Sequence, residues 1–86
     1  MPIFRDHVEM LRKDVALSIS LDDESDMAYL RLADRGKHSV KQIVVGTDEA
    51  GGELVLDMDA DGRLIGIEIF DARSLLPDKI LSALTE

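Results

Sequence analysis

Residues 54–70 read LVLDMDADGRLIGIEIF, in which two alternating apolar segments flank a short acidic turn. Apolar residues at every second position indicate β-strands that have one apolar face. These positions are Leu54, Leu56 and Met58 before the turn, and Ile65, Ile67 and Ile69 after it. An Asp can start a tight turn, and Gly62 can adopt the positive φ needed to leave it. The stretch therefore predicts an antiparallel hairpin.

The same period of two recurs towards the N-terminus. Alternating apolar residues predict strands over 15–21 and 28–32, joined by the acidic turn 22–26, and an apolar run predicts another strand over 40–46. The links between these strands are too short for the crossovers that a parallel sheet requires. The chain is therefore expected to be mainly β (α+β), with a five-stranded antiparallel meander or half-barrel.

Helical spacing appears only near the two ends of the chain. Phe4, Val8 and Leu11 predict a short amphipathic helix over residues 3–12. Pro77 suits the first turn of a second helix, whose apolar stripe contains Ile80, Leu81 and Leu84. With 86 residues there is room for one domain. It comprises an N-terminal helix or arm (1–14), the antiparallel sheet (15–72) and a C-terminal helix (74–86).

Composition excludes several functional classes. Eighteen acidic and ten basic residues give a formal net charge of -8. This charge argues against binding to a nucleic-acid backbone or to an anionic membrane surface, both of which attract basic proteins. The chain has no cysteine, and therefore no disulfide, thiol nucleophile or thiolate metal site. No apolar run approaches the roughly 20 residues that span a bilayer. A cytoplasmic protein without a cofactor is expected.

The predicted sheet has more apolar surface than two short helices can cover. The strand over 40–46 is apolar on both faces, and in the strand 63–70 Leu64 and Phe70 lie opposite the three isoleucines. Apolar patches larger than a few hundred Å² seldom stay exposed on a monomer. A curled half-barrel or a homodimer that buries the second face is therefore expected.

Two stretches resemble the domain of unknown function 2283, a small and mostly bacterial family. Residues 21–32 resemble its opening hairpin, an acidic turn followed by a strand that holds Ala28, Tyr29 and Arg31, and residues 55–72 resemble its closing hairpin. Leu21 and Asp23 stand where an aromatic residue and a proline are often found in this family. The resemblance implies no catalytic residue, and some similar proteins are suspected of antitoxin-like roles.

The acidic turn also has the spacing of a calcium-binding loop. Asp57, Asp59 and Asp61 occupy positions one, three and five of an EF-hand pattern, with Gly62 at six and Glu68 at twelve. An EF-hand loop lies between two helices, whereas this one lies between predicted strands. Glu68 would be roughly 20 Å along its strand from the turn, at ~3.3 Å per residue. A weak cation site formed by Asp57, Asp59 and Asp61 alone is the remaining metal hypothesis.

Glu68 is a carboxylate in an otherwise apolar strand, and Arg31 lies on the polar side of another strand. The two could form a structural or interface ion pair, which is the favoured interpretation, or act as a small catalytic site. Gly66, beside Glu68, indicates a β-bulge or the close approach of a bulky side chain such as Tyr29.

Acidic residues are concentrated in the second half of the sheet. Residues 42–72 contain eight of them and a single basic residue, Arg63. The acidic residues are Asp48, Glu49, Glu53, Asp57, Asp59, Asp61, Glu68 and Asp71. They predict an acidic patch near 48–61 that could meet a basic protein partner. The leading hypothesis is a non-enzymatic, homodimeric interaction or regulatory module. The alternatives are a divalent-cation (Ca²⁺) binding protein and a small enzyme using Glu68 and Arg31.

Overall fold

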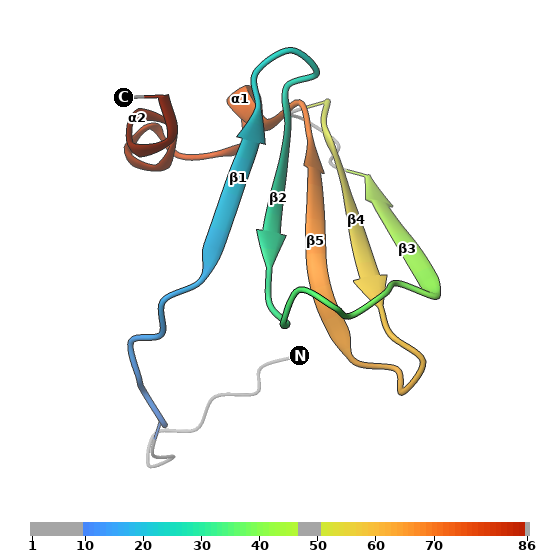
Figure 1. Cartoon of the computed structure of the whole chain (residues 1–86). Helices are drawn as coiled ribbons and strands as arrows, with labels where there is room; N and C mark the ends of the chain where they lie inside the picture. Colours follow the sequence, from blue (N-terminus) through green and yellow to red (C-terminus); the bar gives the residue numbers. More distant parts are fainter. Residues whose placement is uncertain (1–9, 47–50, 86) are drawn as a thin grey trace.

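The computed structural model describes residues 10–46 and 51–85, which form one antiparallel five-stranded sheet followed by two short helices (Figure 1). The strands are β1 (Ser18–Asp22), β2 (Met27–Arg31), β3 (Lys41–Gly46), β4 (Glu53–Met58) and β5 (Leu64–Phe70). The helices are α1 (Ala72–Leu75) and α2 (Asp78–Thr85). The mainly β fold class and the C-terminal helix predicted from the sequence are confirmed.

The strand order is β1-β2-β5-β4-β3, so the sheet is not a strictly sequential meander. β5 lies at the centre, paired with both β2 and β4, and three of its residues (Ile65, Gly66 and Ile69) are buried. All of β3 is exposed, and β3 lies at an edge. The connection 32–40 spans about 14 Å, three strand spacings, from β2 to β3. Nine residues are enough for that distance.

The predicted N-terminal helix is not observed where the structure describes the chain. Residues 10–17 have no helical structure and lead away from the lower end of β1 (Figure 1), while residues 3–9 of the prediction lie outside the described residues. Ten or so residues are marginal for an isolated helix, so this segment needs packing contacts to become helical.

The hydrophobic core is small, and its main cluster lies on one face of the sheet, while Val55 is buried on the other. Its buried cluster consists of Ala28, Ile69 and Ala72, against which Leu75 and Leu76 of the α1 region pack. No large side chain is fully buried in the described part of the chain. The two helices are both short, and α2 has no buried residue. The helices therefore cover only part of the sheet.

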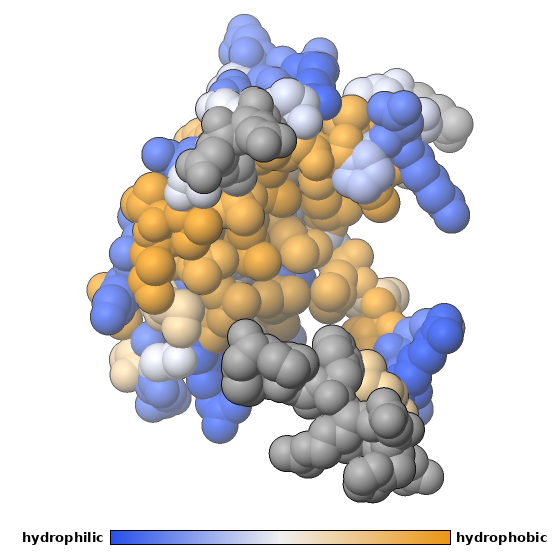
Figure 2. All heavy atoms as spheres, turned by 180° about the vertical axis from the view of Figure 1, so that it is seen from behind, coloured by the Kyte–Doolittle hydropathy of each residue, from blue (hydrophilic) through white to orange (hydrophobic). Residues whose placement is uncertain are grey.

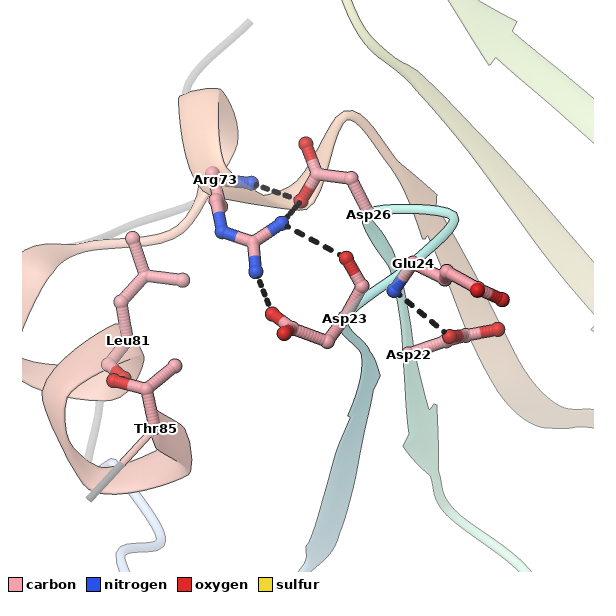
Figure 3. Close-up of polar contacts among 7 residues, drawn as sticks. All are labelled: Asp22, Asp23, Glu24, Asp26, Arg73, Leu81 and Thr85. Atoms are coloured by element: carbon pink, nitrogen blue, oxygen red, sulfur yellow. Dashed lines mark hydrogen bonds and ion pairs between the residues drawn. The ribbon is translucent and has the colours of Figure 1, made fainter.

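A polar contact attaches α1 to the β1–β2 turn (Figure 3). The Asp26 carboxylate accepts hydrogen bonds from the Arg73 backbone N–H (3.0 Å) and from Arg73 Nη1 (3.1 Å), while its carbonyl accepts one from the Ala72 N–H (2.9 Å). Arg73 Nη2 also contacts Asp23 Oδ1. The acidic turn therefore holds the start of α1 at the end of β5.

Candidate functional site

Five polar side chains meet on one face of the sheet, and we call them the polar cluster. They are Tyr29 and Arg31 (β2), Gln42 (β3), Asp57 (β4) and Glu68 (β5). Directly opposite residues of antiparallel strands point to the same face. The register pairs Tyr29 with Glu68, Arg31 with Gly66, Gly66 with Asp57, and Asp57 with Gln42. The five side chains therefore share a face although they come from four strands.

Asp57 is the buried centre of this cluster, with 4% of its surface exposed. The Tyr29 ring lies directly over Gly66, where a Cβ atom would overlap the ring. Gln42 Nε2 donates hydrogen bonds to Asp57 Oδ1 (2.9 Å) and to Glu68 Oε2 (3.0 Å). One amide group therefore ties the edge strand β3 to both β4 and β5. A buried carboxylate requires partners of this kind, because burial without them is costly.

The cluster changes the proton affinity of two of its members. Burial is the main cause that raises the pKa of Glu68, followed by its hydrogen bond to Asp57 and repulsion from that carboxylate, while Gln42 acts in the opposite direction. Burial likewise raises the pKa of Tyr29, and the nearby Asp57 adds to the effect. Two carboxyl groups this close favour a shared proton, since both cannot ionise without repulsion.

Arg31 and Glu68, paired in the sequence analysis, lie on the same face but are not joined by an ion pair in the described structure. The Arg31 guanidinium lies 5.2 Å from the centre of the Tyr29 ring, a cation–π distance. Glu68 instead contacts Gln42 and Asp57. The role of Gln42 was not predicted, because it depends on the pairing of β3 with β4. Gly66 was a usable signal: Tyr29 approaches it, and the β4–β5 register shifts beside it.

The three aspartates of the acidic turn do not converge. Asp57 points into the polar cluster, whereas Asp59 Oδ1 accepts hydrogen bonds from the backbone N–H groups of Asp61 and Arg63, both at 2.9 Å. These bonds lower the pKa of Asp59. Asp61 is exposed. Among the described residues no group of three or more His, Asp or Glu side chains is placed to hold a metal ion. The acidic spacing is therefore explained by a hydrogen-bonded hairpin turn.

The predicted acidic patch is not one surface in the described part of the chain. Residues 51–53 and the turn 59–62 lie at opposite ends of β4 (Figure 1), roughly 20 Å apart for six strand residues. Asp57 and Asp59 are buried and hydrogen-bonded within the protein. Asp48 and Glu49 lie outside the described residues. The acidic residues before and after β4 are close in the sequence, but the length of this strand places them at opposite ends of the sheet.

The opposite face of the sheet carries mainly apolar side chains, with Lys41 at the start of β3 as the one charged residue that the described strands place on it, and we call it the apolar face. Figure 2 shows it as a broad hydrophobic surface. The register assigns to it Ile19, Leu21, Ala28, Leu30, Ile43, Val45, Leu54, Leu56, Ile67 and Ile69. Of these only Ala28 and Ile69 are buried, while Ile43 and Val45 are exposed. The apolar stripe of α2 is also only half-buried, at Ile80, Leu81 and Leu84. The other six of the ten sheet residues are partly buried, so this face is only partly covered.

A known family matches the part of the chain that contains the two hairpins, their acidic turns and the segment 66–69 of the central strand. A family model described as "Protein of unknown function (DUF2283)" matches residues 18–73, from the start of β1 to α1. The chain belongs to the DUF2283 family. No curated protein and no solved structure matches it. In this DUF2283 protein the polar cluster and the apolar face both lie inside the matched region. No helix in the described ranges has the length and apolar content needed to cross a membrane.

The carboxyl pair of this DUF2283 protein predicts a pH-dependent effect at Glu68. A raised pKa means that the folded state holds the Glu68 proton more tightly than the unfolded state. Stability is therefore lost as the pH rises above the ordinary value of about 4.5 towards the raised pKa. Glu68→Gln keeps an acceptor for Gln42 and cannot ionise. We expect this variant to be more stable than the wild type at pH 7, with the difference shrinking at pH 4.

Urea unfolding of both proteins at the two pH values measures this effect. Glu53→Gln is the matched control, because Glu53 in β4 is an exposed carboxylate on the same face of the sheet as Glu68. It should give no such difference between the two pH values. A Glu68→Gln variant less stable than the wild type at pH 7 would show that the Glu68 carboxylate stabilises the cluster.

Proposed function

We propose that this protein is a non-enzymatic, homodimeric interaction module in which a second copy covers the apolar face. The observation that supports this most directly is the incomplete cover of that face. Of its ten apolar residues named above, only Ala28 and Ile69 are buried, and Ile43 and Val45 at the β3 edge are exposed. The α2 helix buries none of its residues, so the two helices of the described structure do not complete a second layer. Contiguous apolar patches of this kind mark interaction surfaces more often than free surface on a monomer.

The chemistry of the apolar face supports a protein partner. The only charged residue that the register of the described strands places on the face is Lys41, at the start of the edge strand β3. Burying apolar side chains contributes about 25 cal/mol per Å² removed from water. The chain carries a net charge of -8, but the described strands place no acidic residue on this face, so like-charge repulsion does not centre on this surface. A second copy offers an equally apolar face, which makes a two-fold symmetric contact self-complementary.

Ile19 and Ser20 offer a matched test of the homodimer. They are neighbours on β1, but Ile19 points to the apolar face and Ser20 is exposed on the polar face. Ile19→Lys should place a charge inside the proposed interface and weaken dimerisation at least about tenfold, because each copy carries the change. Ser20→Lys adds the same charge on the opposite face and should leave the dimer intact.

Light scattering coupled to size exclusion at micromolar concentration measures the outcome, with circular dichroism to confirm that both variants fold. A wild-type protein that is monomeric under these conditions would contradict the proposal. So would an Ile19→Lys variant that folds and dimerises as well as Ser20→Lys.

We do not propose cation binding or catalysis for this chain. The carboxylates of the 57–61 turn are used within the fold, Asp57 by Gln42 and Asp59 by the turn backbone. In the polar cluster, Asp57 is buried and satisfied rather than presented to a ligand. The exposed acidic residues are spread over both ends of the sheet, so a basic partner would find no single acidic surface among the described residues.

A further inference from the structure

Strand β3 is an edge strand with little protection against pairing with another chain. It lies at the end of the strand order, and all six of its residues are exposed. Its apolar side chains lie on both faces: Ile43 and Val45 on the apolar face, and Val44, 60% exposed, on the other. Proteins usually protect such edges with charges, proline or a covering segment. Here Lys41 is the only charged residue of the strand, and the strand has no proline.

Residues 10–17, which we call the arm, show the complementary feature. The arm is not helical, leads away from the sheet at the lower end of β1 (Figure 1) and is exposed throughout. Leu11 is 100% exposed and Val15 68% exposed, and Met10 and Leu17 are also largely exposed. β2 ends at Arg31, opposite Ser18, so β2 offers the arm no continuation of the sheet. The outer edge of β3 and the arm are therefore both left without a strand partner among the described residues.

The arm cannot pair along β3 of its own chain. β1 and β3 are opposite edges of the sheet, separated by four strand spacings, or about 19 Å. The eight residues of the arm reach at most about 26 Å when extended. Crossing the sheet would therefore use most of the arm and leave only about two residues to pair along β3. A β3 edge occupied by residues 10–17 must belong to another copy.

Length and side-chain pattern fit this arrangement. Eight arm residues are enough to cover the six of β3. In an extended arm, Leu11, Val15 and Leu17 point to the same side as Ile19 of the apolar face. Arg12 and Asp14 point to the opposite side. Lys13 interrupts the apolar side once. An arm paired along β3 would therefore extend the apolar face beyond Ile43 and Val45.

We propose that the homodimer exchanges arms, with residues 10–17 of each copy added as a sixth strand along β3 of the other. This inference rests on the proposed homodimer and specifies how the two copies are joined. It covers the exposed edge, gives the arm a partner and satisfies backbone groups of β3 that the sheet itself leaves unpaired.

The absence of cysteine in the chain allows a direct test by cross-linking. Val15→Cys and Val45→Cys each introduce a single thiol, one on the arm and one on the apolar side of β3. The two variants are mixed, allowed to exchange subunits and treated with a short bis-maleimide, which tolerates a small register shift. We expect a cross-linked heterodimer in the mixture at several times the yield of either variant alone. Ile67→Cys, at the centre of the apolar face, reports contact between the apolar faces of the two copies.

Each outcome assigns the contact. Val45→Cys alone cross-linking as efficiently as the mixture would show that β3 pairs with β3 of the other copy, and would overturn arm exchange. A dimer by light scattering with no cross-link between Val15→Cys and Val45→Cys would also overturn it, while leaving the homodimer intact. A monomer by light scattering would overturn both proposals.

Hydrogen exchange provides a second measurement that does not depend on thiol chemistry. Val15→Pro removes a backbone N–H from the arm without changing β3. Those amides of Lys41–Gly46 that point away from β4 should then exchange at least about tenfold faster in the dimer, while those of β5 keep their wild-type rates. Unchanged exchange in β3 would contradict the proposal.

Discussion

Replacing Gly66 by alanine should lower the free energy of unfolding by about 2 kcal/mol and move Tyr29 out of the polar cluster. A Cβ at Gly66 would overlap the hydroxyl and two ring carbons of Tyr29, so the ring cannot stay where it is. Overpacking of this kind costs about 1–3 kcal/mol, and the lost hydrogen bond to Asp57 adds about 1. The usual gain from replacing a strand glycine, up to about 1 kcal/mol, offsets part of this cost.

Gly46→Ala is the matched control for Gly66→Ala, because Gly46 is also a strand glycine but has nothing within 4 Å of its would-be Cβ. It should be neutral or slightly stabilising. Tyr29 is the only tyrosine of a chain without tryptophan, so its fluorescence and the titration of its phenol report on the cluster directly. In Gly66→Ala the raised pKa of Tyr29 should return towards its ordinary value. Equal stability of the two alanine variants, with an unchanged Tyr29 titration, would refute this account of the cluster.

Replacing Asp26 by alanine should destabilise the protein by about 2 kcal/mol, through two separate effects. The Asp26 carboxylate accepts the Arg73 backbone N–H at the start of α1, and losing a bond of this capping type costs about 1 kcal/mol. Asp26 also has a φ of 55°, a left-handed conformation that costs alanine about 1 kcal/mol more than Asp, Asn or Gly. The half-exposed Arg73 contributes little through its charge.

Three variants in urea unfolding separate these contributions. Asp26→Gly tolerates the backbone conformation but loses the acceptor, and should cost about 1 kcal/mol. Asp26→Asn keeps the side-chain acceptor and tolerates the left-handed backbone conformation, so it should cost less than Asp26→Gly. Asp23→Ala removes the other carboxylate that contacts Arg73. Because the Asp23 side chain is largely exposed, its loss should cost under about 1 kcal/mol. If Asp23→Ala proves as damaging as Asp26→Ala, the ion pairs rather than the backbone contacts hold α1 to the turn.

The local elements of the fold could be predicted because their signals lie within a few residues. Alternation over 54–70 and the Asp–Gly turn led to the β4–β5 hairpin, and Pro77 with its apolar stripe led to α2. Strand order could not be predicted in the same way. It depends on contacts between strands far apart in the chain, such as that between Gly66 of the central strand β5 and the Tyr29 ring of its neighbour β2.

The candidate site was predictable only in part. Glu68 and Arg31 were identified as unusual for their strands, and the structure places them on one face of adjacent strands. Asp57 was assigned to the acidic turn because of its spacing from Asp59, yet it belongs to β4 and shares the face of Gln42 and Gly66, whereas Asp59 lies in the turn. Gln42 carries no signal in the sequence, because its contacts with Asp57 and Glu68 exist only once β3 lies beside β4.

By itself the sequence determined an acidic, cysteine-free, antiparallel β domain with too much apolar surface for its two short helices. That conclusion needs only side-chain alternation, turn chemistry and counts of residues. The tertiary structure alone decided that the carboxylates are separated into a buried cluster and a hydrogen-bonded turn, and that the apolar residues gather on one open face. The physical reason is register: pairing of non-consecutive strands sets which side chains are neighbours, and a one-residue shift would send each of them to the other face.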